Sequence, residues 1–162
     1  MMTPTLDALS VALGQALAAR GWMLATAESC TGGWIAEAVT ATAGSSGWFD
    51  RGFVTYSNAA KVDMLGVSPA TLATHGAVSE QTVCEMAAGA LAHSRAQLAV
   101  AVSGVAGPSG GSVDKPVGMV CVAWAQSGET PQAVTLHFDG DRQAVRLQTV
   151  EHALHGLIRL AG

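Results

Sequence analysis

The sequence has 162 residues, of which 49% are hydrophobic and 12% charged, and its formal net charge is -4. A chain of this length is typical of one domain and buries roughly 70% of its unfolded surface without disulfides. No apolar run reaches the roughly 18 residues that span a bilayer, and no basic segment leads into an apolar run at the N-terminus. The eight Lys and Arg residues are scattered, whereas nucleic-acid binding needs clustered cations. We therefore expect no membrane, secretion-signal or nucleic-acid association.

Cysteine usage and charge content bear on the compartment of the protein and on its oligomeric state. Cys30, Cys84 and Cys121 form no CxxC pair and are odd in number. This pattern is typical of a reducing cytoplasm and argues against a disulfide framework. The low charge content leaves apolar surface to cover between subunits, so we expect a homodimer or a higher homo-oligomer in the cytoplasm.

The first half of the chain alternates helical and extended patterns. Leucines recur at helical spacing in the first segment, and Gly21 follows them as a stop signal. The predicted elements are, in chain order, a helix over 5–20, a buried strand over 22–27, a helix over 31–43, a loop over 44–47, a strand over 51–57 and a short helix over 61–65.

The second half continues this alternation and then breaks it. Ser68-Pro69 opens another helical turn, because proline suits the first helical position. The further elements are an alanine-rich helix over 80–93 after Ser79, a buried strand over 97–103, a glycine-rich loop over 104–116, strands over 117–126 and 133–138, and a last helix capped by Asp141. The last two strands lack an intervening helix, so part of the sheet is expected to be antiparallel. The pattern predicts an α/β fold with a mixed sheet covered on both faces, in a single domain over 1–162.

The first candidate site is the segment T-A-E-S-C-T-G-G, residues 26–33, which ends a predicted strand and opens a helix. Such turns lie at the carboxyl edge of the sheet, where open α/β folds bind ligands. Ser29 and Thr31 offer hydroxyls, and Gly32 and Gly33 let a ligand approach the main chain. Two alternatives stay open: the hydroxyls cap the helix, or Cys30 is the nucleophile rather than a small apolar residue.

The second candidate site is Y-S-N-A-A-K, residues 56–61, which follows the second predicted strand. Lys61 is one of only two lysines in the chain. A lysine can act as a base only where burial or a nearby cation disfavours its charged form. The alternatives are a solvated Lys61 and a Tyr56 that serves as a core aromatic residue.

The third candidate site is S-G-V-A-G-P-S-G-G, residues 103–111, which follows a buried strand. Its glycines, Gly104, Gly107, Gly110 and Gly111, allow backbone amides to face an anion. The segment lacks the Gly-Lys-Ser/Thr of a Walker loop. Arg142, in G-D-R near the start of the last helix, could bind a phosphate or carboxylate bidentately. A plain loop and a surface ion pair are the alternatives.

Common metal-binding motifs are missing from the sequence. His152 and His155 are three residues apart on the last helix, but no carboxylate or cysteine set accompanies them. Neither HExxH nor CxxC occurs. We expect neither a metal nor a cofactor.

Together these segments resemble the CinA C-terminal-domain family, the nicotinamide-nucleotide amidohydrolases. The matching pieces run from residue 26 to residue 146 and are T-A-E-S-C-T-G-G, G-F-V-T-Y-S-N-A-A-K, H-G-A-V-S-E, S-G-V-A-G-P-S-G-G, K-P-V-G and G-D-R-Q-A-V-R. Met119 departs from the family pattern, in which threonine is expected. The resemblance implies a three-layer α/β/α fold and hydrolysis of nicotinamide mononucleotide to nicotinic acid mononucleotide and ammonia. It places Ser29, Tyr56 and Lys61 on the proposed catalytic positions.

The resulting expectation is acyl transfer to water through serine. Ser29 attacks the carboxamide carbon, Lys61 takes its proton, and Tyr56 relays a proton or helps Lys61 to protonate the departing ammonia. Amides near Cys30, Thr31, Gly32 and Gly33 would stabilise the oxyanion. Phosphate and ribose of the mononucleotide would bind to Arg142 and to a loop set that comprises Ser103, Gly104, Gly107, Gly110 and Gly111. The rival hypothesis is a nucleotide-binding module without catalysis, which has no use for a desolvated lysine.

Overall fold

The computed structural model describes residues 4–162, which form six α-helices, one short 3-10 helix and five strands. The helices are α1 (Pro4–Arg20), α2 (Trp34–Thr40), α3 (Asn58–Leu65), α4 (Pro69–His75), α5 (Glu80–Ala92) and α6 (Arg142–Ala161), with the 3-10 helix η1 at Ser45–Gly47. The strands are β1 (Leu24–Glu28), β2 (Phe49–Val54), β3 (Leu98–Gly104), β4 (Met119–Gln126) and β5 (Gln132–His137).

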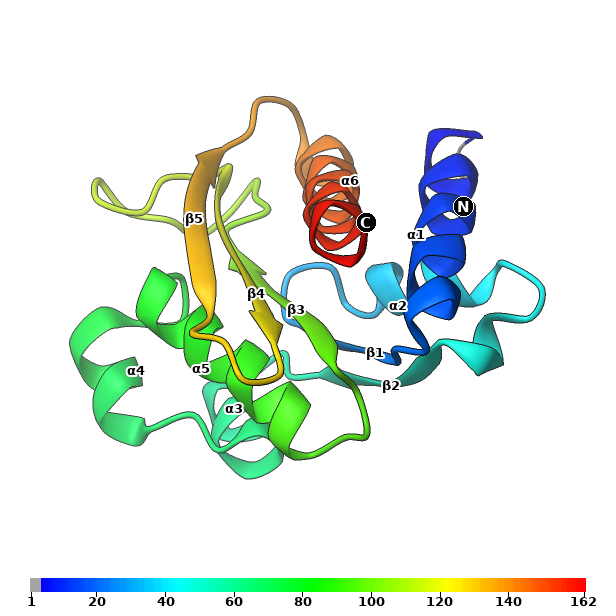
Figure 1. Ribbon diagram of the computed structural model, residues 1–162. Coiled ribbons are helices and arrows are strands. Elements are labelled where there is room, and N and C mark those ends of the chain that lie inside the picture. The colour runs from blue at the N-terminus through cyan, green and yellow to red at the C-terminus, as the bar shows by residue number, and fades with distance from the viewer. Residues whose placement is uncertain (1–3) are drawn as a thin grey trace.

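The strands form one mixed sheet in the order β2-β1-β3-β4-β5. β1 pairs in parallel with β2 and with β3, whereas β4 pairs antiparallel with β3 and with β5. Helices α1, α2 and α6 cover one face of the sheet and α3, α4 and α5 the other (Figure 1). The expected three-layer α/β/α fold with a mixed sheet is confirmed.

The two faces of the sheet carry side chains of different size. Along β3, Leu98, Val100 and Val102 pack towards α1 and α6, whereas Ala99 and Ala101 pack towards α5. Since successive side chains of a strand point to opposite faces, this alternation gives α5 a surface of small residues. α5 matches it with Ala87 and Ala90, both fully buried. The small side chains on both surfaces therefore let α5 lie close to the sheet.

The helix starts follow the side chains that cap them. Ser57 caps α3 by accepting from the Ala60 amide at 3.0 Å, and Asp141 caps α6 by accepting from the Ala144 amide at 2.9 Å. The expected caps at Ser68 and Ser79 also form.

Several boundaries differ from the sequence expectation, and three of them bear on the site. The helix expected from residue 31 begins at Trp34, because Gly32 and Gly33 have positive φ angles of 60° and 106° and prolong the turn. The strand expected over 51–57 lies at Phe49–Val54, so Tyr56 is beyond the sheet. The strand expected from residue 117 begins at Met119, after Gly118 with a φ of 95°.

Candidate active site

The carboxyl ends of the three parallel strands meet at one edge of the sheet, and two hydrogen bonds extend the strand pairing beyond the strands. The Ser29 amide donates to the Val102 carbonyl at 3.1 Å, and the Thr55 amide donates to the Glu28 carbonyl at 2.8 Å. Ser29 and Thr55, which directly follow β1 and β2, are thereby fixed side by side at this edge. This is the position at which open α/β sheets bind ligands.

Lys61 reaches this edge from the first turns of α3. Its side chain is 1% exposed, and its Nζ lies 3.0 Å from Ser29 Oγ and 2.7 Å from the Thr55 carbonyl oxygen. No carboxylate of the described residues forms an ion pair with it. Burial disfavours the charged ammonium and lowers the pKa of Lys61 below its ordinary value. The structure thus brings together two residues that the sequence placed in separate motifs, 32 positions apart.

Lys61 Nζ donates to Ser29 Oγ and to the Thr55 carbonyl oxygen. In the neutral state the same contact with Ser29 can reverse its direction. A neutral amine has one lone pair, which can accept the Ser29 hydroxyl proton, and N–H groups, one of which can donate to Thr55. A hydroxyl that donates to a base is the arrangement of an activated nucleophile. Ser29 is itself 9% exposed, so its hydroxyl is accessible only from the pocket side. The alternative of a solvated Lys61 does not describe this side chain.

Cys30 is next to this pair but in a different state. Burial raises the pKa of the Cys30 thiol to about 11, and the residue is 7% exposed. The reactive form of cysteine is the thiolate, which such a pKa makes rare at neutral pH. Cys30 is therefore the weaker of the two nucleophile candidates.

The turn after Ser29 leaves several backbone amides free. The Gly32 amide donates to the Ser29 carbonyl at 3.1 Å. The amides of Cys30, Thr31 and Gly33 donate to no acceptor within residues 4–162. Unpaired amides beside a nucleophile are the donors that an oxyanion needs. Of the four residues of the turn expected to bind substrate, three contribute such an amide, whereas that of Gly32 closes the turn.

Glu28 stabilises this turn by hydrogen bonds to its side chain, a role that sequence reasoning missed. Its carboxylate is 1% exposed and accepts three hydrogen bonds, from Thr31 Oγ1 at 2.5 Å and from the Ile35 and Ala36 amides at 2.9 and 3.1 Å. It therefore binds the first turn of α2 and uses the Thr31 hydroxyl. The signal in the sequence is a glutamate at the end of an otherwise apolar strand, because buried carboxylates need such partners.

Tyr56 and Arg142 lie on the outer wall of the site. Tyr56 is 65% exposed, and Arg142 Nη2 donates to its hydroxyl at 3.3 Å. Arg142 Nη1 donates to the Gly107 carbonyl at 2.8 Å, so Arg142 is not in a surface ion pair. Tyr56 is not a core aromatic residue, and its hydroxyl contacts Arg142 rather than Lys61. Its role as a proton relay stays a prediction.

A pocket of about 340 Å³ connects these groups, and its lining residues are Ser29, Cys30, Tyr56, Gly104, Ala106, Gly107, Ser109 and Arg142. Two neighbouring pockets adjoin it along the start of α6. One of about 340 Å³ includes Thr31, Gly32 and Gly33, and one of about 650 Å³ shares Ala106 and Arg142 with the first. The residues expected to bind substrate are therefore divided between adjoining pockets.

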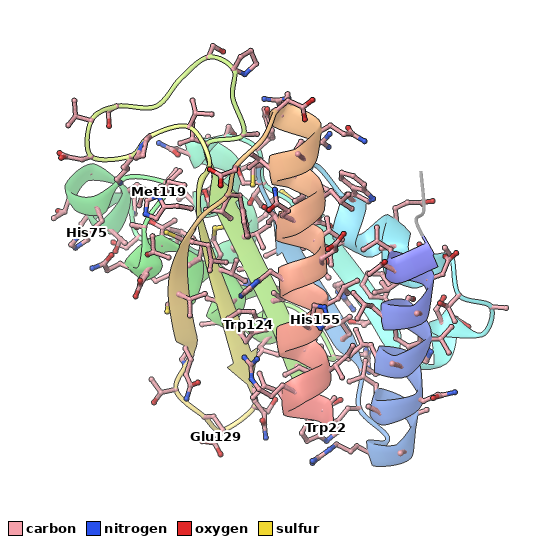
Figure 2. The ribbon with its side chains drawn as sticks, turned by 90° about the horizontal axis from the view of Figure 1, so that it is seen from above. Trp22, His75, Met119, Trp124, Glu129 and His155 are labelled. Atoms are coloured by element: carbon pink, nitrogen blue, oxygen red, sulfur yellow. The ribbon has the colours of Figure 1, made fainter. Side chains whose placement is uncertain are left out.

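The glycine-rich loop over 105–118 rises beside the start of α6 (Figure 2). Gly107, Gly110 and Gly111 have positive φ angles, and their amides have no acceptor in the described part of the chain. Gly104 and Gly107 line the pocket of Ser29, whereas Gly110 and Gly111 do not. Ser103 is 1% exposed within β3 and lines none of these three pockets. Only part of the expected loop set is thus placed to contact a ligand beside Ser29.

Two general features complete the description of residues 4–162. They contain no group of three or more His, Cys, Asp or Glu residues that could hold a metal ion. His152 instead packs against Trp124 and Phe138, with ring centroids 6.3 and 6.2 Å away. No helix in this range is long and apolar enough to cross a bilayer.

The fold and site define a class, a three-layer α/β protein with a serine–lysine pair at the carboxyl edge of its parallel strands. Residues 6–161 match the model of the CinA C-terminal domain, and the chain belongs to this family. Similar proteins include the nicotinamide-nucleotide amidohydrolase PncC of Enterobacter agglomerans, 55% identical over 98% of this chain and 97% of that protein. The protein of the same name from Escherichia coli (strain K12) is 57% identical over 92% of this chain and 90% of that protein.

Solved structures agree with this assignment. The competence/damage inducible protein CihA from Agrobacterium tumefaciens is 48% identical, with a TM-score of 0.97 over 100% of this chain and 99% of that chain. A CinA superfamily protein from Klebsiella pneumoniae is 43% identical, with a TM-score of 0.92 over 96% of this chain and 97% of that chain. The resemblance seen in the sequence motifs is confirmed.

Proposed function

We propose that this chain hydrolyses the carboxamide of nicotinamide mononucleotide to nicotinic acid mononucleotide and ammonia. The observation that carries the proposal is the 3.0 Å contact between Ser29 Oγ and the Nζ of a fully buried lysine, Lys61. The names of relatives at 55 and 57% identity support the substrate. A purely binding module gains nothing from a buried lysine, whereas an amidohydrolase needs a base for its nucleophile.

The reaction proceeds by two acyl transfers. Ser29 Oγ bonds to the carboxamide carbon while its proton passes to the neutral Nζ of Lys61. The tetrahedral oxyanion binds the free amides of the turn after Ser29. The C–N bond then breaks, and the proton on Lys61 goes to the departing nitrogen, because ammonia leaves poorly as an amide anion. Water attacks the acyl-serine and gives a proton to Lys61. As the bond between the acyl carbon and Ser29 Oγ breaks, Lys61 passes this proton to Ser29 Oγ, and the released acid loses its proton to solvent as the carboxylate. Tyr56 assists these proton transfers.

Substrate recognition is assigned to the outer wall of the pocket. The Arg142 guanidinium and the unpaired amides of the glycine-rich loop offer positive charge and donors for a phosphate. A substrate that spans the pocket would place its pyridine ring beside Ser29 and its phosphate towards Arg142. The scheme uses no metal and no cofactor. We further propose a role in pyridine nucleotide recycling. The odd number of cysteines and the low charge content support a cytoplasmic location and a homo-oligomer.

The test is release of ammonia and nicotinic acid mononucleotide from nicotinamide mononucleotide by the purified protein. Ser29→Ala should lower turnover by about 10³-fold or more, because nucleophile and base act as a unit. Lys61→Arg should do the same, since an arginine keeps its proton at neutral pH. Cys30→Ala is the matched control and should keep most of the turnover. Both inactive variants should still bind the mononucleotide.

Two outcomes would contradict the proposal. Binding of the mononucleotide without ammonia release by the wild-type protein would favour the nucleotide-binding module. Loss of turnover in Cys30→Ala, with activity retained in Ser29→Ala, would transfer the nucleophile role to the thiol.

A further inference from the structure

Arg146 lies one turn after Arg142 on α6 and contacts the nucleophile turn directly. Its Nε donates to the Cys30 carbonyl at 3.1 Å, and its Nη2 donates to the Thr31 carbonyl at 3.1 Å. The guanidinium also lies over the Trp34 ring, 5.4 Å from its centroid. No carboxylate in the described chain forms an ion pair with it. A fixed fork of donors is thus committed to two consecutive peptide groups.

These two carbonyls determine where the next two amides point. In a planar trans peptide the C=O of one residue and the N–H of the next point in opposite directions. The only cis bond in residues 4–162 is Gly107-Pro108, so the peptides after Cys30 and Thr31 are trans. Arg146 therefore fixes the direction of the Thr31 amide through the Cys30 carbonyl, and that of the Gly32 amide through the Thr31 carbonyl.

The two fixed amides differ in whether they have a hydrogen-bond acceptor. The Gly32 amide donates to the Ser29 carbonyl at 3.1 Å and closes the turn. The Thr31 amide finds no acceptor in residues 4–162, although Thr31 is fully buried. A buried backbone amide normally has a partner. The Thr31 amide is thus an unpaired donor two residues after Ser29, held by a guanidinium on the far side of its peptide group, in a residue that lines the pocket with Gly32 and Gly33.

We propose that Arg146 is a positioning residue that aims the Thr31 amide at the oxyanion formed on the carboxamide attacked by Ser29. This inference rests on the proposed amidohydrolase function. Since the oxyanion exists only after attack, the interaction stabilises the transition state and not the bound substrate. Loss of Arg146 should therefore lower kcat and leave KM nearly unchanged.

A competing role for Arg146 is the binding of substrate phosphate by its charge. Arg146 lines both pockets that adjoin the one beside Ser29, so a ligand could reach it. The two roles differ in what a lysine can replace. A lysine keeps the charge for a phosphate, but its single ammonium does not reproduce the fork that spans two carbonyls.

The experiment compares Arg146→Lys and Arg146→Met with the wild-type protein. Steady-state kinetics with nicotinamide mononucleotide give kcat and KM, and calorimetry gives the Kd and the binding stoichiometry of the product, nicotinic acid mononucleotide. The stoichiometry counts folded sites, so kcat is expressed per folded molecule. Arg159→Met is the matched control, because Arg159 lies on the same helix and stacks on Trp124 away from the site.

For both Arg146 variants we expect kcat to fall about 10- to 100-fold, since complete loss of an oxyanion donor costs about 10²- to 10³-fold. KM and product Kd should change less than about threefold, and Arg159→Met should resemble the wild type. A rise in KM and Kd in Arg146→Met that Arg146→Lys restores would instead show a phosphate-binding charge. Unchanged kcat in both variants would show that the turn holds its own geometry. A wild-type protein without ammonia release would overturn the proposed function itself.

Discussion

Lys61 is among the largest side chains that the fold buries completely, and no carboxylate of residues 4–162 forms an ion pair with it. Both groups that accept a hydrogen bond from it, the Ser29 hydroxyl and the Thr55 carbonyl, are neutral. Burial of an unpaired ammonium is costly, and proteins usually avoid the cost by neutralising the group. In the proposed mechanism this cost in stability supplies a free amine beside Ser29.

This cost predicts a specific pH dependence of stability. Because burial lowers the folded pKa of Lys61, the unfolded chain binds more protons between that pKa and the ordinary lysine value of about 10.4. Stability therefore gains from Lys61 as pH rises through this window. Lys61→Met should lose this gain, so its stability relative to the wild type should decline from pH 7 to pH 10. Urea unfolding of both proteins across this range measures the difference.

The comparison between variants removes the contribution of Cys84 and Cys121, whereas Cys30 lies close enough to Lys61 for each to affect the pKa of the other. Burial raises the pKa values of Cys30, Cys84 and Cys121, which makes stability fall at alkaline pH, but both proteins contain all three. Ser29→Ala keeps Lys61 and should keep the wild-type slope. A pH-independent difference between Lys61→Met and the wild type would mean that Lys61 titrates alike in the folded and unfolded states.

Individual site residues were predictable to different degrees. Ser29, Lys61 and Arg142 were predictable because each follows a recognisable strand-to-helix junction. Arg146 was not assigned a role, although its spacing from Arg142 places both on one helix face. Its partners are backbone carbonyls of a turn 115 and 116 residues away, and such contacts depend on how α6 docks. Glu28 was missed for the same reason, since its acceptor role depends on the fold of α2.

At the scale of elements, the close packing of α5 depends on Gly89. A methyl group on Gly89 would overlap the Leu65 carbonyl oxygen at the end of α3 and lie 2.8 Å from its carbonyl carbon. The obstacle is backbone, which cannot rotate away as a side chain does. Gly89 therefore lets α3, the helix that carries Lys61, lie directly against α5.

We predict that Gly89→Ala destabilises the protein, although glycine-to-alanine changes inside helices usually stabilise by about 1 kcal/mol. The overlap should cost about 1–3 kcal/mol and lower Tm by about 2–4 °C per kcal/mol. Gly47→Ala is the control, because its new methyl group would meet nothing within 4 Å. A calorimetric scan in which Gly89→Ala equals or exceeds the wild-type Tm would show that α3 moves aside freely.

Element types and order were predictable from apolar periodicity, whereas some ends were not. The pattern over 31–43 contains the apolar residues of α2, but it does not show that Gly32 and Gly33 adopt positive φ. That conformation depends on the bonds of the turn to Glu28 and Arg146. The error is informative, because the residues lost from the start of the helix include Thr31 and Gly33, whose unpaired amides are candidate oxyanion donors.

At the scale of the whole molecule, the sheet ends in an edge strand without charges. β5, Gln132–His137, contains no Lys, Arg, Asp or Glu, and Val134 within it is 37% exposed. Edge strands of monomers are usually protected by charged residues or bulges. β2 at the other edge carries Asp50 and Arg51. The unprotected edge agrees with the low charge content of the sequence.

We therefore predict self-association. Light scattering at micromolar concentration should give at least twice the chain mass of 16.4 kDa, and dilution should show whether the assembly dissociates. A constant mass of one chain across the dilution series would reject the proposed homo-oligomer and leave β5 as a solvated edge. The layers of the fold follow from the sequence, but an interface does not, because a single chain contains no information on which exposed face a partner covers.

The hydrogen bonds that extend the strand pairing past β1 and β2 predict that backbone amides of the site exchange with solvent at different rates. The amides of Ser29 and Thr55 donate to carbonyls of the neighbouring strands, whereas those of Gly110 and Gly111 have no acceptor in residues 4–162. Amide protons of the first kind exchange with solvent only when strands separate, and those of the second kind exchange from the native state. We therefore expect the amide protons of Ser29 and Thr55 to exchange late and those of Gly110 and Gly111, in the glycine-rich loop, to exchange early.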